Sequence, residues 1–186
     1  MEGSEQLAVI IPMLKTVGAG ILPEQLDGST PCTSFTVSDV RDHMTGLASL
    51  YAPAFRGDAP PNDRDPARAG DEDQAARFQR AMDALLDAVQ SPGALQRTLD
   101  TPFGPMPGAV FARLVAFDGL VHGWDLATST QQPWDPPDDL VAEVDAFARQ
   151  AIAPEMRDGD TFAQETHAPP DATPLLRLVA FSGRSV

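Results

Sequence analysis

The chain has 186 residues, of which 42% are hydrophobic and 22% charged, a composition typical of a folded globular protein and sufficient for one domain over residues 1–186. Its formal net charge of -14 makes nucleic-acid binding unfavourable, and its longest apolar stretches fall far short of the roughly 20 residues that cross a bilayer. The polar, acidic first residues lack the pattern of a secretory leader, so we expect a cytoplasmic protein without a membrane span.

Two helices are predicted in the first third of the chain. Apolar residues at three- and four-residue spacing predict one over residues 4–21, with a bend at Pro12. Thr36 and Asp39 form a capping-box pattern, in which a hydroxyl is followed three residues later by an acid, so a second helix is expected to begin there. His43 lies in the apolar stripe of this second helix. Its imidazole is therefore expected to face the protein interior.

The middle of the chain predicts one long helix between two irregular segments. Pro53 and Gly57 should end or bend the preceding helix, and the proline-rich stretch 58–70 is expected to be a mobile loop. Residues 71–90 have acids at their start, an apolar face and a Ser-Pro-Gly stop, and so predict a third helix. Residues 95–105 have strand character, but their prolines restrict them to a loop or a small irregular hairpin.

Three further helices are predicted in the second half of the chain. They cover residues 107–128, 138–152 and 175–181, and the last is a short terminal helix. The first of them carries Asp118 and His122. Because every long regular segment is helical, the sequence predicts an all-α protein.

Asp118 and His122 form the core of a candidate metal site. A four-residue separation at 3.6 residues per turn places both side chains on the same helix face. His43 projects from the apolar stripe of another helix, so packing of the two helices could bring all three side chains together. Two imidazoles and a carboxylate suit zinc, nickel or iron(II), and three protein ligands leave a position open for water or substrate. Cys32, the only cysteine, allows no disulfide and no cysteine metal cluster.

Without a metal, the same residues have an ordinary structural explanation, which spacing alone favours. A lone inward histidine is more often a hydrogen-bonded core residue, and an Asp-His pair at helical spacing can be a simple ion pair. Asp125 offers a competing carboxylate three residues after His122, but with Trp124 it is assigned a structural role. His167 lies in a predicted loop and is expected to be a solvated surface residue.

Three segments, in this order, resemble one known family. They read TPCTSFTVSDVRDH over residues 30–43, LVHGWDLA over 120–127 and LRLVAFSGR over 176–184. These segments resemble the actinobacterial metal-binding proteins of the DinB-like superfamily, and in particular the amino-terminal domain of mycothiol-dependent maleylpyruvate isomerase. The resemblance covers nearly the whole chain, and it places the metal site ahead of the structural explanation.

The resemblance implies a DinB/YfiT-like four-helix bundle with one or two extra helices. It also implies a metal held by a histidine of the second helix and by an acid-x-x-x-His pair of a later helix, positions that His43, Asp118 and His122 match. Asp118 is shorter than the glutamate usual in this pattern, and Phe35 stands where a tryptophan is common. The separate carboxy-terminal domain of the isomerase is not expected here, so isomerase activity itself is not carried over.

The function that follows is a metal-dependent enzyme of transferase or isomerase type, with zinc as the first choice of metal and a low-molecular-weight thiol such as mycothiol as partner. Arg41, Arg80 and Arg113 lie on helices expected to frame the bundle and are candidates to hold a substrate carboxylate. Cys32 is a weaker candidate nucleophile, because its place beside Pro31 suits loop packing equally well. Two alternatives stay open: a non-catalytic protein that binds a metal or small ligand, and a homodimeric binding module.

Overall fold

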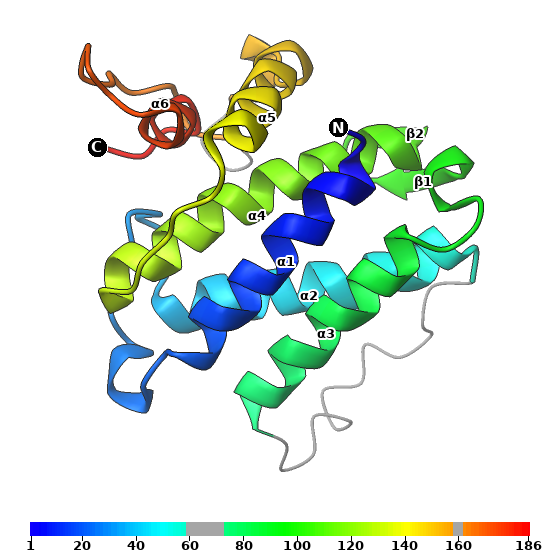
Figure 1. Ribbon diagram of the computed structural model, residues 1–186, viewed down its shortest axis with the longest axis horizontal. Coiled ribbons are helices and arrows are strands. Elements are labelled where there is room, and N and C mark those ends of the chain that lie inside the picture. Colours follow the sequence, from blue (N-terminus) through cyan, green and yellow to red (C-terminus); the bar gives the residue numbers. More distant parts are fainter. Residues whose placement is uncertain (59–72, 158–161) are drawn as a thin grey trace.

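Helices dominate the computed structural model, which describes residues 1–58, 73–157 and 162–186 (Figure 1). The predicted all-α class is confirmed, since the small hairpin between the third and fourth helices is the one sheet in these ranges. In chain order the elements are α1 (Gly3–Ala19), α2 (Val37–Arg56), α3 (Gln74–Val89), β1 (Thr98–Thr101), β2 (Gly104–Pro107), α4 (Gly108–Thr130), α5 (Asp138–Ala151) and α6 (Pro174–Phe181). Short 3-10 turns lie in the connections: η1 (Pro23–Gln25), η3 (Ala94–Gln96) and η4 (Pro154–Met156).

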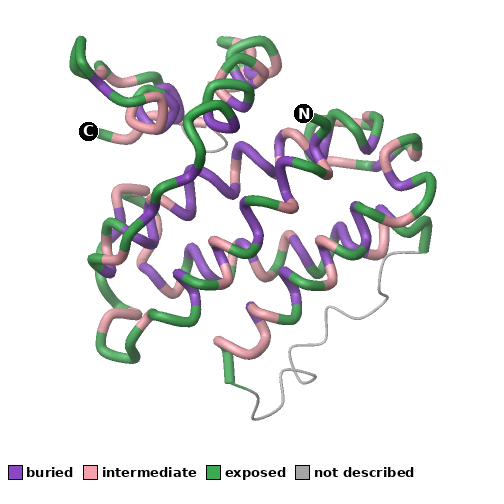
Figure 2. Tube along the Cα trace, viewed as in Figure 1, coloured by how far each residue is buried: buried purple, intermediate pink, exposed green. Residues whose placement is uncertain are grey.

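The first four helices pack around a shared apolar core. α1 contacts α3 and α4, and α2 contacts the same two helices, so each helix has two neighbours. The buried stretches of these helices face one another (Figure 2). Leu7, Ile10, Ile11 and Leu14 of α1 are each at most 2% exposed, as expected for apolar residues that share one helix face. Burial of such apolar surface is the main force that holds the helices together.

Both ends of α2 follow from its sequence. The hydroxyl of Thr36 accepts the backbone N–H of Asp39 at 3.2 Å, and the carboxylate of Asp39 accepts the backbone N–H of Thr36 at 2.9 Å. The predicted capping box is therefore confirmed. Pro53 does not end the helix, which continues to a C-cap at Gly57, where φ is 83°. The fixed start of α2 sets the helical register that carries His43.

The boundaries of the other predicted helices agree closely with the structure. The helix predicted over 71–90 is α3, and the carboxylate of its N-cap, Asp73, accepts a backbone N–H of the first turn at 3.0 Å. Residues 71 and 72 of that prediction, and the loop predicted over 58–70 apart from its first residue, lie outside the described residues. The predictions for α1, α4, α5 and α6 are correct to within two residues at each end.

The proline-rich stretch after α3 forms a regular hairpin, not the irregular one expected. β1 and β2 pair antiparallel, with Thr98 opposite Pro107 and Thr101 opposite Gly104. Gly104 has a φ of 91°, which the tight turn requires. Prolines are tolerated because each strand of a two-stranded sheet has a free edge, where a missing N–H costs little. Both strands contact α4, so the hairpin leads directly into the helix that carries the site.

α4 lies at the centre of the protein. It packs against α1 and α2 on one side and against α5 and α6 on the other, and its buried residues are distributed around the whole helix. The packing is close: a Cβ atom added at Gly123 would lie 2.2 Å from the ring of Trp134, which follows α4. Polar side chains on α4 are therefore enclosed by neighbouring elements. Even so, no helix in the described part of the chain is long and apolar enough to cross a bilayer.

Candidate metal centre

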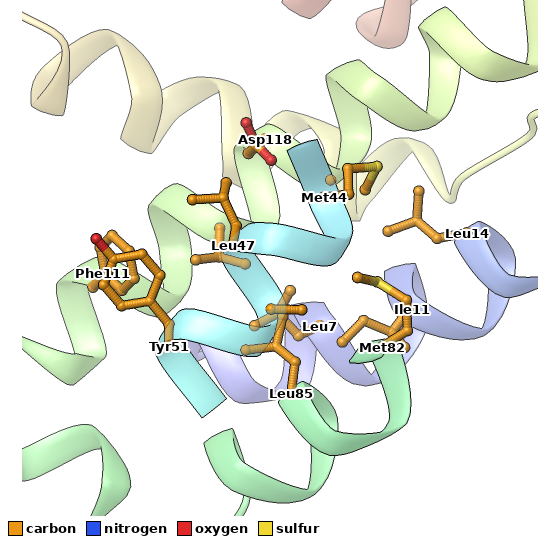
Figure 3. Close-up of a pocket in the computed structure, with 13 residues that line it drawn as sticks. Leu7, Ile11, Leu14, Met44, Leu47, Tyr51, Met82, Leu85, Phe111 and Asp118 are labelled. Atoms are coloured by element: carbon orange, nitrogen blue, oxygen red, sulfur yellow. The ribbon is translucent and has the colours of Figure 1, made fainter. Parts of the chain in front are cut away.

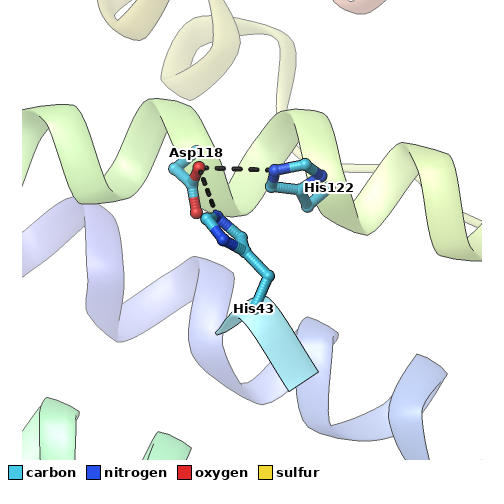
Figure 4. A group of neighbouring side chains, drawn as sticks. All are labelled: His43, Asp118 and His122. Atoms are coloured by element: carbon cyan, nitrogen blue, oxygen red, sulfur yellow. Dashed lines mark ion pairs between the residues drawn. The ribbon is translucent and has the colours of Figure 1, made fainter. Parts of the chain in front are cut away.

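Three side chains from two neighbouring helices meet at one point (Figure 4). His43 projects from α2, while Asp118 and His122 project from α4, one helical turn apart. The Oδ1 atom of Asp118 lies 3.6 Å from Nε2 of His43 and 3.5 Å from Nε2 of His122. The structure thus brings together the three residues that the sequence analysis selected as ligands.

The spacing of these atoms suits one small ion. All three candidate ligand atoms lie within 4.8 Å of one another. Tetrahedral ligands about 2.1 Å from a zinc ion are roughly 3.4 Å apart, close to the two nitrogen–oxygen distances found here. Imidazole nitrogens and a carboxylate oxygen are also ligands that zinc, nickel and iron(II) accept. The residues therefore fit a divalent metal in both spacing and chemistry.

The site has an open side and a closed side. The side chains of His43 and Asp118 are each 31% exposed, whereas that of His122 is 8% exposed. Towards the core, Asp118 borders an otherwise apolar cavity of about 30 Å³ between the first four helices (Figure 3). Sites for small molecules usually measure about 300 Å³ or more, and this cavity has room for about two waters. A ligand would therefore approach from the exposed side, past His43 and Asp118.

Two further residues lie behind His122. Asp125 is fully buried, and its Oδ2 atom is 3.0 Å from Nδ1 of His122. Arg184, which follows α6, donates two hydrogen bonds to the Asp125 carboxylate, at 2.8 Å and 3.3 Å. Sequence reasoning assigns Asp125 only a structural role, although its three-residue spacing from His122 is a usable signal. It gives Arg184 no role, although Arg184 ends the third segment of the family resemblance, because nothing local in the sequence connects two residues that are 59 positions apart.

The loop before α2 covers part of the site. The ring centroid of Phe35 lies 5.6 Å from that of His43 and 6.2 Å from that of His122. Cys32 belongs to the same loop and is partly buried. Burial raises the pKa of the Cys32 thiol, and the positive charge of Arg184 offsets only part of that rise. A protonated thiol is a poor nucleophile, so the structure gives no support to Cys32 as a catalytic group.

The charges around Asp118 favour its ionised form. Burial by itself would raise the pKa of Asp118, but His122, His43 and Arg184 together outweigh burial and lower this pKa. The Asp118 carboxylate in turn raises the pKa of His43, against the opposing effect of burial. Asp118 is therefore ionised, as a metal ligand must be. A metal would have to compete with a proton for His43, which makes metal binding weaker as the pH falls.

The three arginines selected for substrate binding make other contacts. Arg41 is buried and donates a hydrogen bond to Gln74 of α3. The guanidinium carbon of Arg113 lies 4.1 Å from the centre of the Phe147 ring of α5. Arg80 belongs to α3, a helix that supplies none of the three candidate ligands. Their role in holding a substrate carboxylate stays a prediction.

Comparison with known proteins identifies the family of the chain. Residues 13–127, which include all three candidate ligands, match the model of the mycothiol maleylpyruvate isomerase N-terminal domain. Two uncharacterized proteins from strains of Mycobacterium tuberculosis, Rv0738 and MT0763, are each 35% identical to the chain over 177 residues, which is 90% of either chain. No solved structure matches the chain significantly. The match over more than half of its length shows that the chain belongs to the family of mycothiol maleylpyruvate isomerase N-terminal domains.

Proposed function

We propose that this protein binds a divalent metal, zinc in the first instance, through His43, Asp118 and His122, and that it uses a low-molecular-weight thiol in a transfer or isomerisation reaction. The observation that carries the proposal is the convergence of three suitable ligand atoms within 4.8 Å of one another. Membership of a mycothiol-related family makes mycothiol the first thiol to test. The proposal describes a cytoplasmic enzyme that acts on a small molecule.

The ligand set supports an open site of the catalytic kind. Three protein ligands leave a tetrahedral ion with one further position, and the exposed sides of His43 and Asp118 give that position access to solvent. When bound, the metal would lower the pKa of a coordinated thiol and so supply a thiolate near neutral pH. His43 and His122 would bind through Nε2. Asp118 would bind through a carboxylate oxygen and offset one positive charge.

The residues around the ligands would orient the reactants. The aromatic ring of Phe35 lies beside both imidazoles, and the small cavity behind Asp118 leaves no room for a substrate in the core. The thiol and its reaction partner would therefore meet on the exposed side. Arg41, Arg80 and Arg113 are the side chains whose removal tests whether a substrate carboxylate is held from the helices.

A non-catalytic metal or small-ligand protein is the rival function. The observation that favours it is the buried connection from His122 through Asp125 to Arg184, since an anchored ligand also suits a structural ion. Chelation distinguishes a structural ion from a catalytic one, because removal of a structural ion unfolds small metal-dependent domains. Retention of the folded state after chelation, together with thiol binding by the metal form, would favour the enzyme.

Elemental analysis of protein purified without an affinity tag tests the metal site. The wild type should contain about one metal ion per chain, and His122→Ala should contain a small fraction of that. His167→Ala is the matched control, because His167 is exposed and lies outside the site. Equal metal content in all three proteins would refute the assignment.

Cobalt substitution tests the thiol. The visible absorption of a cobalt form should change when mycothiol is added, because sulfur would replace a water ligand. S-methylated mycothiol is the control, since it lacks an ionisable sulfur. Absence of any change with mycothiol and with simpler thiols would refute a thiol-dependent reaction and leave the metal site standing.

A further inference from the structure

Asp125 links Arg184 to His122 through its carboxylate. The Oδ2 atom of Asp125 contacts both Nδ1 of His122, at 3.0 Å, and a terminal guanidinium nitrogen of Arg184, at 2.8 Å. The Oδ1 atom accepts the Nε–H of Arg184 at 3.3 Å. Asp125 is 0% exposed and the Arg184 side chain 13% exposed, so water competes little for these bonds.

The donors and acceptors in this chain decide which nitrogen of His122 carries the proton. Arginine has only donors and a carboxylate has only acceptors, so Asp125 can join His122 only if Nδ1 donates. The competing carboxylate, Asp118, lies 3.5 Å from Nε2, beyond the usual range of an N–H···O hydrogen bond. Neutral His122 is therefore held with the hydrogen on Nδ1. Its lone pair lies on Nε2, on the side of Asp118 and His43.

We propose that Asp125 and Arg184 are positioning residues that fix the tautomer and ring orientation of His122, so that Nε2 is available as a ligand. The inference rests on the proposed function in one respect, namely that Nε2 is the atom that binds the metal. In metal sites generally, the carboxylate that accepts from the second ring nitrogen orients the imidazole and raises its basicity. Here that carboxylate is itself held by an arginine.

Backbone contacts of the segment after α6 fix the position of Arg184. Its backbone N–H bonds to the carbonyl of Val179 at 3.1 Å, and its carbonyl accepts a hydrogen bond from the hydroxyl of Thr166. Gly183 precedes it with a φ of 94°, and a Cβ atom there would lie 2.4 Å from Ala163. Arg184 lies outside residues 13–127, the range of the family match. The segment after α6 thus completes the candidate site.

A purely structural role is the competing explanation, in which the ion pair only ties the end of the chain to α4. The two explanations differ in what they predict for His122. A structural tie affects stability but leaves the tautomer unaffected. A positioning pair controls the ring proton, which nitrogen-15 NMR of the imidazole measures directly in metal-free protein at a pH where histidine is neutral.

The test uses Asp125→Leu/Arg184→Met, which replaces both partners with apolar groups and so avoids leaving a buried charge unpaired. The chain has three histidines, so His43→Ala and His167→Ala suffice to assign the signals. We expect Nδ1–H in the wild type and loss of this preference in the double variant. Zinc affinity should fall by about 10- to 100-fold in the double variant. The matched control is Lys15→Met/Asp83→Leu, which removes an ion pair between α1 and α3 outside the candidate site and should change neither quantity.

Each outcome decides the question. Nε2–H in the wild type would overturn the proposal without any variant, even if the double variant failed to fold. An Nδ1–H signal that persists in the double variant would overturn it as well. If the wild type bound no metal but the tautomer changed in the double variant, the positioning role would stand and the proposed function would fail.

Discussion

Asp118 is the candidate ligand whose side-chain length departs from the pattern of the resembling family. Resembling proteins commonly have the longer glutamate here, yet the shorter acid already places Oδ1 at 3.5 and 3.6 Å from the two imidazole nitrogens. α2 and α4 are in contact, and in this packing Asp118 lies close to an imidazole of each helix.

Replacement of Asp118 should separate charge from shape. Asp118→Asn keeps the shape but removes the negative charge, so zinc affinity should fall by at least about tenfold. Asp118→Glu keeps the charge and should retain affinity within about tenfold of the wild type. Competition with a chromophoric chelator measures both, and Asp145→Asn, at a partly buried position of α5 outside the candidate site, is the control. Wild-type affinity in Asp118→Asn would show that Asp118 is not a ligand.

Contacts between residues close together in the sequence could be predicted for this site, whereas contacts between distant residues could not. Helical periodicity alone places Asp118 and His122 on one face. Their meeting with His43 depends on how α2 packs on α4, which periodicity does not determine and the family resemblance implied. Arg184 reaches Asp125 from a separate segment at the end of the chain, so only the folded structure reveals it. The sequence thus predicted the candidate ligands but not the residues that hold one of them.

At the scale of the elements, two helix glycines lie in opposite surroundings, one tightly packed and one open. A Cβ atom at Gly123 in α4 would lie 2.2 Å from the Trp134 ring, whereas one at Gly46 in α2 would meet no atom within 4 Å. Gly123→Ala should therefore destabilise the protein by about 1 to 3 kcal/mol through overpacking. Gly46→Ala should stabilise it by about 0.5 to 1 kcal/mol through helix propensity. Urea denaturation measures both, and equal effects of the two variants would contradict this account of α4 packing.

The N-cap of α2 gives a second prediction. Thr36→Ala removes the side-chain oxygen that accepts the Asp39 backbone N–H and should lower the free energy of unfolding by about 1 kcal/mol. Thr45→Ala is the control within the same helix, because its hydroxyl only bonds to the preceding turn. Its effect should stay within about 0.5 kcal/mol. A loss in Thr45→Ala as large as that in Thr36→Ala would indicate a general cost in α2 and not a cap.

The same cap should make stability depend on pH. Hydrogen bonds from the side chain and backbone of Thr36 lower the pKa of Asp39 below its ordinary value of 3.8. A lowered folded-state pKa contributes stability above the unfolded-state value, and the contribution is lost as the pH falls through the folded-state value. The advantage of the wild type over Asp39→Asn should therefore be present at neutral pH and be lost once the pH falls below the lowered, folded-state pKa of Asp39. A difference that does not change between these limits would contradict the cap.

The elements themselves were largely predictable, and the exceptions have physical causes. Helix starts carry local signals such as the capping box, and apolar periodicity marks the helical faces. Pro53 and Gly57 were expected to end or bend α2, and Gly57 does end it, whereas Pro53 lies inside the last turn. The hairpin forms despite its prolines because its strands have free edges and Gly104 makes the turn.

At the scale of the whole molecule, the candidate metal site lies at the edge of the apolar core. The core between the first four helices consists of apolar side chains, and the candidate ligands lie at its margin, with His43 and Asp118 partly exposed. α4 belongs to both, since it carries two ligands and packs against four other helices. A metal would therefore stabilise a protein that is already folded, rather than being required for folding.

This separation predicts the response to metal. Chelation should lower the midpoint of thermal unfolding but leave the helical circular dichroism signal intact at room temperature, because the apolar core does not depend on the ion. Zinc at about 100 times its dissociation constant should stabilise the wild type by about 2.7 kcal/mol through mass action. His122→Ala should show no such gain, whereas His167→Ala should behave like the wild type. Unfolding of the wild type on chelation would instead indicate a structural ion, because the helices are lost on metal removal only when the fold requires the metal.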